Sequence, residues 1–269
     1  MRLRALIGLA AAALALPGAA GAGLGDGAVA TDGFMPIASL QVRDLPVAGA
    51  RTPAARQAPL RRFTMAAFHW QGAGTVEFRT HGAAGWSAWR PADPEAEDAP
   101  DATSPEAAAT RAWHDGAPWW TGPADRLQTR TRGRVTALRS YTVWSPATPA
   151  AARATPVPRR LAAAVPRKGR AAAPTVVLRA AWGADETITK PPTLSPSVRF
   201  AVIHHTAGLN NYTREQSAAI VRGIQLYHVT GNGWNDIGYN FLVDKFGQVF
   251  EGRRGGIDKP VIGAHAVGF

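Results

Sequence analysis

Hydrophobic and polar positions alternate along much of the first half of the chain. The clearest run is Thr75–Thr80, where valine and phenylalanine alternate with polar residues, and Leu127–Arg132 and Val135–Val143 have similar patterns. A period of two is typical of half-buried strands. Glycine and proline interrupt these runs at short intervals, and no amphipathic helical period is found between them. We therefore predict a small all-β domain over 61–144, most simply a sandwich-like one.

The pattern changes in residues 199–231. Arg199–His204 contains a run of apolar residues, which predicts a buried strand that ends at His204. Thr213 fits the N-cap of a following helix, with an acidic and an amide residue in the first turn. Apolar residues at helical spacing continue the helix, and Gly231 or Gly233 is expected to end it.

The residues after this helix predict a hairpin. Ile237–Val243 and Gln248–Glu251 are strand-like, and the four residues Asp244–Gly247 separate them. Gly247 stands where a turn favours positive φ, which supports a tight connection between the strands.

The first 22 residues have the pattern of a secretory signal peptide. Arg2 and Arg4 precede an apolar run, Ala5–Leu16, and the small residues Ala20-Gly21-Ala22 fit a cleavage site. A membrane anchor is the alternative, but the run is shorter than the roughly 20 residues that span a bilayer. We therefore predict an exported protein, in which residues 23–60 form a low-complexity lead-in.

Composition and charge add constraints on partners. The chain has 269 residues and no cysteine, which excludes disulfides and thiolate metal ligands within them. Its net charge of +11 makes anionic polymers candidate partners. Residues 145–173 are rich in proline and alanine and hold six basic residues without an acidic one, so we predict an extended linker whose charge suits an anionic cell-wall polymer. The linker has no aromatic residue, which together with export argues against a nucleic-acid partner.

Two features stand out within the predicted β domain. Residues 91–110 are acidic and rich in proline and alanine, which predicts a long surface loop. Tryptophan is unusually frequent, and its indoles could stack on sugars or fill the core. The core interpretation is favoured because each indole buries a large apolar area. The tryptophans concerned are Trp70, Trp86, Trp89, Trp113, Trp119, Trp120 and Trp144.

His204 and His205 stand at the end of the predicted buried strand. Neutral imidazole binds zinc well, and a strand end would fix the direction of the ring. Taken alone, the pair fits a structural role better than a metal site.

Five motifs extend the interpretation of this histidine pair, because they follow one another in order and at fitting spacings. They are Arg179-Ala-Ala-Trp-Gly-Ala184, Val202-Ile-His-His-Thr-Ala207, Gly233-Trp-Asn-Asp-Ile-Gly-Tyr-Asn-Phe241, Asp244-x-x-Gly-x-Val-Phe-Glu-Gly-Arg253 and Gly263-Ala-His265. With them, residues 174–269 strongly resemble the peptidoglycan recognition protein and type 2 N-acetylmuramoyl-L-alanine amidase family. The signal, β segment and linker resemble, more loosely, secreted bacterial members that carry an extra N-terminal domain.

The resemblance implies a fold and a site. The fold would be an α/β (α+β) domain with a mixed central sheet flanked by helices. His204 would be a zinc ligand, and the catalytic Tyr239 would direct its hydroxyl at the scissile amide. His265 and Thr206 would contact substrate in the groove.

The resemblance also assigns supporting roles. His228 would be structural, His205 would pack beside the ligand, and Arg253 would hold the fold or the groove wall. A closed site of three histidines at 204, 228 and 265 is a less favoured alternative. The remaining zinc ligands are expected beyond Phe269, so the 269 residues alone are expected to be inactive.

The function implied for the complete protein is zinc-dependent hydrolysis of the amide bond between N-acetylmuramic acid and L-alanine. Zn²⁺ would be the cofactor and peptidoglycan the partner, at a bacterial cell wall outside the cytoplasm. The alternative from another class is a non-catalytic module that binds muropeptide in the same groove. A third interpretation, anchoring on anionic wall polymers through the linker, is compatible with both.

Overall fold

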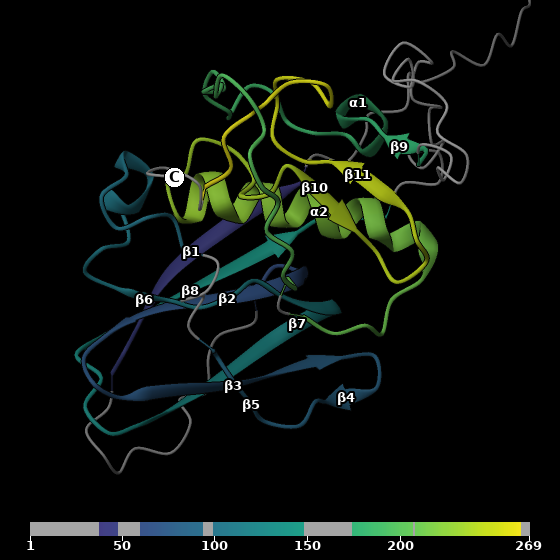
Figure 1. Ribbon diagram of the computed structural model, residues 1–269. Helices are drawn as coiled ribbons and strands as arrows, with labels where there is room; N and C mark the ends of the chain where they lie inside the picture. Colours follow the sequence, from purple (N-terminus) through teal and green to yellow (C-terminus); the bar gives the residue numbers. More distant parts are fainter. Residues whose placement is uncertain (1–37, 48–59, 94–98, 148–173, 207, 265–269) are drawn as a thin grey trace, which may run out of the picture. The chain divides into compact units, whose positions relative to one another are not determined.

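The computed structural model describes residues 38–47, 60–93, 99–147, 174–206 and 208–264 (Figure 1). The predicted signal peptide, most of the predicted linker and His265 lie outside these residues, so those predictions stay untested. Among the residues described, no helix is both long and apolar enough to cross a membrane.

Eight strands form one sheet in the first part of the chain. Its hydrogen-bonded order is β1-β8-β2-β7-β3-β4, with β5 paired to β3 and β6 paired to β2. The all-β prediction is therefore confirmed for this part, although a single sheet replaces the predicted sandwich. The strands are β1 Ser39–Leu45, β2 Phe63–Gln71, β3 Thr75–Gly82, β4 Gly85–Trp86, β5 Arg90–Pro91, β6 His114–Asp115, β7 Trp119–Arg132 and β8 Ala137–Trp144.

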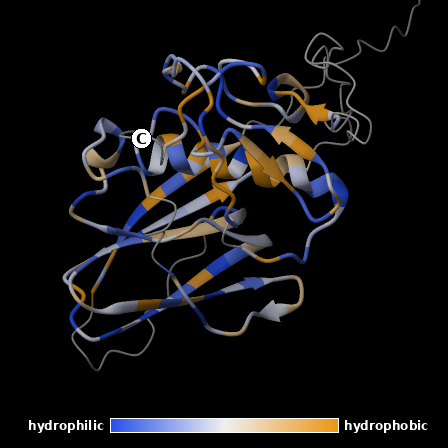
Figure 2. Cartoon of the chain, in the orientation of Figure 1, coloured by the Kyte–Doolittle hydropathy of each residue, from blue (hydrophilic) through white to orange (hydrophobic). Residues whose placement is uncertain are grey.

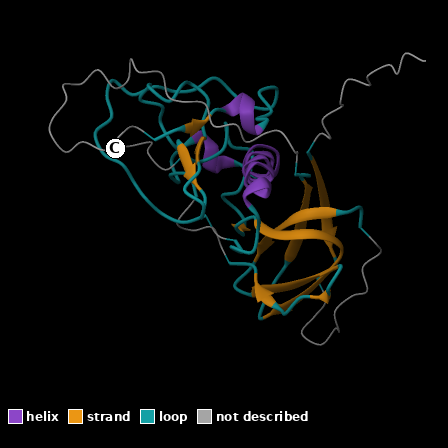
Figure 3. Ribbon diagram, turned by 90° about the vertical axis from the view of Figure 1, so that its right-hand side faces the viewer, coloured by secondary structure: helices purple, strands orange, loops and turns teal. Residues whose placement is uncertain are grey.

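Strand β7 explains why one sheet can enclose a core. Its first residues pair with β2 and its later residues, up to Arg132, pair with β3, so one long strand joins two neighbours that lie at different angles. Register shifts in both ladders allow the bend. Figure 3 shows the result as a strongly curved layer of strands. Strand β1 comes from the segment expected to be a lead-in, and it pairs with β8 from Ser39 to Leu45.

Strand β2 is buried on both faces, and its sequence is accordingly apolar at most positions. Ala66, Phe68 and Trp70 point into an inner core enclosed by the curved sheet, where the rings of Phe68 and Phe78 are 4.8 Å apart. The inner core also contains Val76, Leu127 and Leu138. Met65 and Ala67, on the other face of β2, join a second core that is shared with the C-terminal residues.

The C-terminal residues form short elements. A three-stranded sheet has the order β10-β11-β9, antiparallel between β10 and β11 and parallel between β11 and β9. The expectation of a mixed sheet with helices is met to that extent. The elements are β9 Val176–Val177, α1 Arg179–Trp182, η3 Arg214–Gln216, α2 Ser217–Leu226, η4 Tyr227–Gly231, β10 Phe241–Val243 and β11 Val249–Glu251; the first part of the chain adds one 3₁₀ turn, η1 Pro105–Ala108.

The predicted helix is confirmed at both ends. Thr213 is the N-cap, and its backbone N–H donates to Oε1 of Gln216 at 2.8 Å, as in a capping box. The last turn widens into the π-helical η4 and ends at Gly231. Helix α2 packs on the sheet so closely that a Cβ added at Gly223 would lie 3.0 Å from Cε of Met65.

The predicted hairpin is also confirmed, with shorter strands than the pattern indicated. Gly247 has a φ of +76°, and its N–H donates to the carbonyl of Asp244 at 3.0 Å. Figure 2 shows apolar residues along β10 and β11, and their exposure differs. Phe250 is fully buried, whereas Phe241 and Val243 on β10 are 45% and 67% exposed.

The predicted buried strand at 199–204 is wrong. These residues have no regular secondary structure, and Val202 and Ile203 are 67% and 95% exposed. An apolar run shows that burial would be favourable, but a strand also needs a neighbour for its backbone N–H and C=O groups. No strand in the described ranges pairs with residues 199–204.

Candidate functional site

His204 and Tyr239 meet on the C-terminal part of the chain. Their ring centroids are 5.3 Å apart, although His204 belongs to the irregular segment after Arg199 and Tyr239 precedes β10. The structure therefore brings together two residues that the sequence analysis assigned to one site. Whether they bind metal and substrate stays a prediction.

The orientation of His204 suits a metal ligand. Its Nδ1 lies 3.0 Å from the carbonyl oxygen of His205. A carbonyl only accepts hydrogen bonds, so Nδ1 must carry the proton and Nε2 holds the lone pair. A histidine held in this way by a backbone carbonyl is a common arrangement beside metals.

Tyr239 is held by the backbone of the Glu-Gly-Arg motif. The N–H of Arg253 donates to the carbonyl of Tyr239 at 2.8 Å. The preceding residue, Gly252, lies so close to Tyr239 that an added Cβ would be 2.0 Å from the same carbonyl oxygen. Glycine is therefore required at 252 for the backbone to approach Tyr239.

His228 lies fully buried on the other side of Tyr239. The two rings are 5.6 Å apart, and His228 also packs on Trp234 at 4.3 Å. Its Nδ1 accepts the N–H of Gly238 at 3.0 Å, which ties the end of the helix to the segment that carries Tyr239. These contacts support the predicted structural role.

Arg253 binds a carboxylate that the sequence analysis missed. Its Nη2 lies 2.6 Å from Oε2 of Glu106, and both side chains are at least nine-tenths buried. Nε and Nη1 of Arg253 also donate to the carbonyls of Ile237 and Ile262 at 3.0 and 3.2 Å. Arg253 thus joins the backbone near Tyr239 to the Gly-Ala-His motif, as predicted for a residue that holds the fold.

Glu106 corrects the prediction that 91–110 is entirely a surface loop. The side chain also accepts the N–H of Asn235 at 3.0 Å. Burial raises the pKa of the Glu106 carboxyl, but the hydrogen bonds and charge of Arg253 outweigh this, so the pKa lies below its ordinary value. A polar residue in an acidic loop gives no sequence signal of such a distant partner.

A second ion-pair cluster joins three of the motifs. Asp236 lies 3.1 Å from Nη1 of Arg179 and accepts the N–H of Arg254 at 2.9 Å. Arg179 also pairs with Glu186 at 2.6 Å and donates to the carbonyl of Gly252. Much of what makes these motifs recognisable is therefore a set of buried cross-links.

The other predicted site residues are either exposed or outside the residues that the structure describes. Thr206 and His205 are exposed, and His265 lies outside the described residues. No group of three histidine, cysteine, aspartate or glutamate side chains gathers around a metal-sized space in the part of the chain that is described. The three-histidine alternative is thus neither supported nor tested at position 265.

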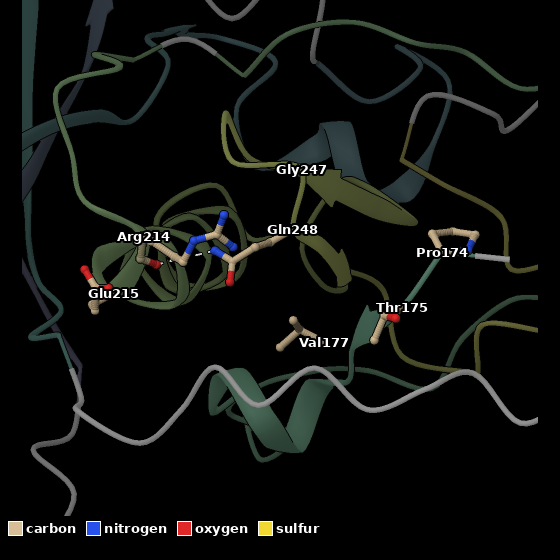
Figure 4. A pocket seen from close by; sticks show the side chains of 7 residues that line it. All are labelled: Pro174, Thr175, Val177, Arg214, Glu215, Gly247 and Gln248. Carbon is tan, nitrogen blue, oxygen red and sulfur yellow. Dashed lines mark hydrogen bonds between the residues drawn. The ribbon is translucent and has the colours of Figure 1, made fainter. Parts of the chain in front are cut away.

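A surface hollow of about 570 Å³ lies between β9, the 3₁₀ turn η3 and the hairpin turn (Figure 4). It is lined by Pro174, Thr175, Val177, Arg214, Glu215, Gly247 and Gln248. None of these is a predicted site residue. The Gln248 side chain donates to the carbonyl of Arg214 across it, at 3.4 Å. We give more weight to the His204–Tyr239 contact, because it unites two motifs.

Sequence comparison finds that part of the chain is similar to peptidoglycan-recognition proteins. Over 94 residues, the chain is 44% identical to peptidoglycan-recognition protein SC2 of Drosophila simulans, covering 34% of this chain and 47% of that protein. It is 35% identical to protein LE of Drosophila melanogaster over 94 residues, covering 35% and 26%. It is 34% identical to human peptidoglycan recognition protein 3 over 105 residues, covering 39% and 28%. About a third of this chain is therefore homologous to that family.

The chain spans about half the length, or less, of the relatives it matches. No family model matches it. Among solved structures, bumblebee PGRP-SA is 35% identical and covers 36% of this chain and 55% of its own, with a TM-score of 0.31. These relatives are animal proteins, whereas the sequence analysis expected a bacterial one, and the source of the chain stays a prediction.

Proposed function

We propose that residues 174–264 bind peptidoglycan and that the protein acts outside the cell. The contact between His204 and Tyr239 carries this proposal, because it joins two of the motifs on which the resemblance to the peptidoglycan recognition family rests, and the chain is similar to proteins named for peptidoglycan recognition. The exposed segment 199–206 and half-buried Tyr239 leave this surface open to a large polymer. The signal-peptide pattern supports export.

The described residues fit one zinc ligand and do not by themselves form a zinc centre. When neutral His204 donates from Nδ1 to the carbonyl of His205, a metal would bind through Nε2. A catalytic zinc site needs three protein ligands, and no such group gathers among the described residues.

The finer proposal is an N-acetylmuramoyl-L-alanine amidase. In this proposal, His204 is one ligand, and the hydroxyl of Tyr239 donates to the carbonyl oxygen of the scissile amide. Charge develops on that oxygen when a tetrahedral intermediate forms, so a donor placed there stabilises the transition state more than the ground state. The products would be an amino-terminal peptide and a glycan with a free lactyl carboxylate.

The alternative is a recognition module without hydrolysis. This alternative requires only the groove, since a groove can bind muropeptide without a complete metal site. Both functions predict binding, and only the amidase predicts cleavage.

One experiment separates the functions. Binding of the secreted protein to purified peptidoglycan is measured in a pull-down assay, and release of stem peptides is followed with zinc present. Binding without peptide release identifies the recognition module, and absence of binding contradicts the proposal altogether.

Two variants test the assigned roles if peptides are released. His204→Ala should lose bound zinc and activity together, while His114→Ala, a histidine on β6 of the sheet, should keep both. Tyr239→Phe should keep zinc and lose about 10²–10³ in kcat. Tyr212→Phe is the matched control, because it likewise removes one tyrosine hydroxyl, which accepts the N–H of Lys245 at 3.2 Å.

A further inference from the structure

The face of the large sheet that points away from the inner core carries arginines and tryptophans. In the β3–β7 ladder, Glu77 lies opposite Arg130 and Arg79 lies opposite Gln128, so these side chains share the outer face. Trp86 on β4 lies opposite His81, which is on the same face of β3. We call this surface the Arg–Trp face and define it by Arg79, Trp86, Trp89, Arg126, Arg130 and Arg132.

Indole and guanidinium groups alternate across this face. The guanidinium of Arg79 lies 4.9 Å from the ring of Trp86 and 4.8 Å from that of Trp89. Trp89 is covered on another side by Arg130 at 4.4 Å. Trp86 is therefore the last indole of the stack; the ring of His81 contacts it edge-on at 5.3 Å, and Trp86 remains 37% exposed. This end presents an ordered aromatic surface to solvent.

Core packing does not account for these two tryptophans. Trp70 and Trp120, which do fill cores, are 2% and 4% exposed. Each exposed cation–π contact contributes only a small part of the stability of the fold. Such contacts hold the side chains in place, but they leave apolar indole area in water that a ligand could cover.

The face also carries positive charge in excess. Among the described residues, Glu77 pairs with Arg130 and Arg132 at 2.8 and 3.1 Å, so one carboxylate serves two guanidinium groups. Arg79 donates to the neutral Gln128 amide at 2.8 Å and has no carboxylate partner in the described ranges. The side chain of Arg132 is 69% exposed. Planar guanidinium groups of this kind bind carboxylates in a fork.

We propose that the Arg–Trp face binds a glycan strand that carries carboxylate groups. A pyranose ring packs its apolar face on the indole of Trp86, and carboxylates pair with Arg79 and Arg132. The peptide-free strand left by muramoyl-alanine hydrolysis has this chemistry, because cleavage frees one lactyl carboxylate on each muramic acid. The choice of that strand rests on the proposed function, whereas recognition of a carboxylated glycan does not.

Peptide-free peptidoglycan glycan strands are the probe, immobilised and presented to the secreted protein at low salt. Trp86→Ala and Arg79→Gln should each weaken binding at least tenfold. Arg132→Gln, at an exposed position, should weaken it several-fold without affecting folding. Arg43→Gln on β1 makes the same charge change on another exposed part of the sheet and should bind like the wild type. Raising the salt concentration should weaken wild-type binding.

Two results would overturn the proposal. One is unchanged binding by folded Trp86→Ala and Arg132→Gln, which would make the stack purely structural. The other is equal wild-type affinity for a neutral N-acetylglucosamine oligomer, which would remove the role of the carboxylates. His204→Ala separates this surface from the proposed function, because it should alter the handling of peptide-bearing peptidoglycan and leave binding of peptide-free strands unchanged.

Discussion

The eight-stranded sheet and the C-terminal residues satisfy their backbone groups in different ways. In the sheet, long ladders pair N–H and C=O groups directly, and charged side chains such as Arg132 lie in water. In the C-terminal part the strands have only two or three residues. There, buried arginines donate to backbone carbonyls instead: Arg222 reaches those of Trp182 and Pro146, each at 2.6 Å. Arginine side chains such as that of Arg132 thus lie at the surface of the eight-stranded sheet, whereas in the C-terminal part some are buried and bind the backbone.

Because of this difference, a sequence pattern has a different physical basis in each region. A period of two describes a region whose hydrogen bonds follow from the strand itself. A motif of isolated polar residues is typical of a region whose backbone is stabilised by specific side-chain contacts, in which each polar residue has its own partner. Single substitutions should therefore be far more damaging at the motif residues than on the outer face of the sheet.

The largest expected effect is at the Arg253–Glu106 pair. Arg253→Gln leaves a buried carboxylate without its cation, so we expect the free energy of unfolding to fall by about 3–5 kcal/mol. Arg132→Gln, at the exposed pair with Glu77, should cost less than about 1 kcal/mol. Denaturant unfolding of both variants measures the contrast. Equal losses would break the comparison between the regions.

A pH dependence tests the shared core. His69 on β2 lies 2.9 Å from the hydroxyls of both Tyr227 and Tyr141, and Asn232 lies 3.1 Å from its Nε2. Tyr227 donates to the carbonyl of Gly116, so Nε2 of His69 donates and its Nδ1 accepts from Tyr141. Burial lowers the pKa of His69 from 6.5 to about 4, against a smaller raising effect of Asn232.

The direction of the effect follows from that shift. The unfolded chain binds the proton more readily between pH 6.5 and 4, so stability from neutral His69 is complete above pH 6.5 and declines as the pH falls toward 4. The decline should be on the order of 3 kcal/mol. Unfolding measured from pH 7 to 4 should show it in the wild type and lose that component in His69→Gln. A wild-type profile identical to that variant would contradict the assignment.

An intermediate effect is expected at Gly252. Gly252→Ala places a Cβ 2.0 Å from the carbonyl of Tyr239, so the backbone must move, at a cost of about 1–3 kcal/mol. Gly247→Ala meets no neighbour and costs about 1 kcal/mol because of its positive φ. Gly252→Ala should also weaken peptidoglycan binding, which Gly247→Ala should not. Thermal unfolding and the pull-down assay measure the two effects.

The smallest effect is expected where the buried strand was predicted. Ile203→Ala removes an exposed side chain, so it should change stability by less than about 0.5 kcal/mol. Ile224→Ala in the shared core should cost about 2–5 kcal/mol. Equilibrium unfolding compares them. A loss at Ile203 as large as at Ile224 would show that residues 199–204 are buried after all.

Local pattern was sufficient where contacts are local. The helix formed by η3 and α2, its cap at Thr213 and the hairpin turn at Gly247 were predictable, because capping boxes, helical periods and positive-φ turns involve residues within a few positions of one another. The motifs likewise identified the neighbourhood of His204 and Tyr239, and the comparisons confirm the resemblance over about a third of the chain.

Tertiary structure alone decided the remaining features, because their partners lie far apart in the sequence. Glu106 and Arg253 are separated by 147 positions, and His69 and Tyr227 by 158. Nothing in an acidic loop or an alternating strand indicates which distant group will neutralise or bond its polar residues. Residues 199–204 show that local pattern can also predict an element that does not form. Their apolar side chains favour burial, but a buried strand depends on a neighbouring strand that these residues cannot supply themselves.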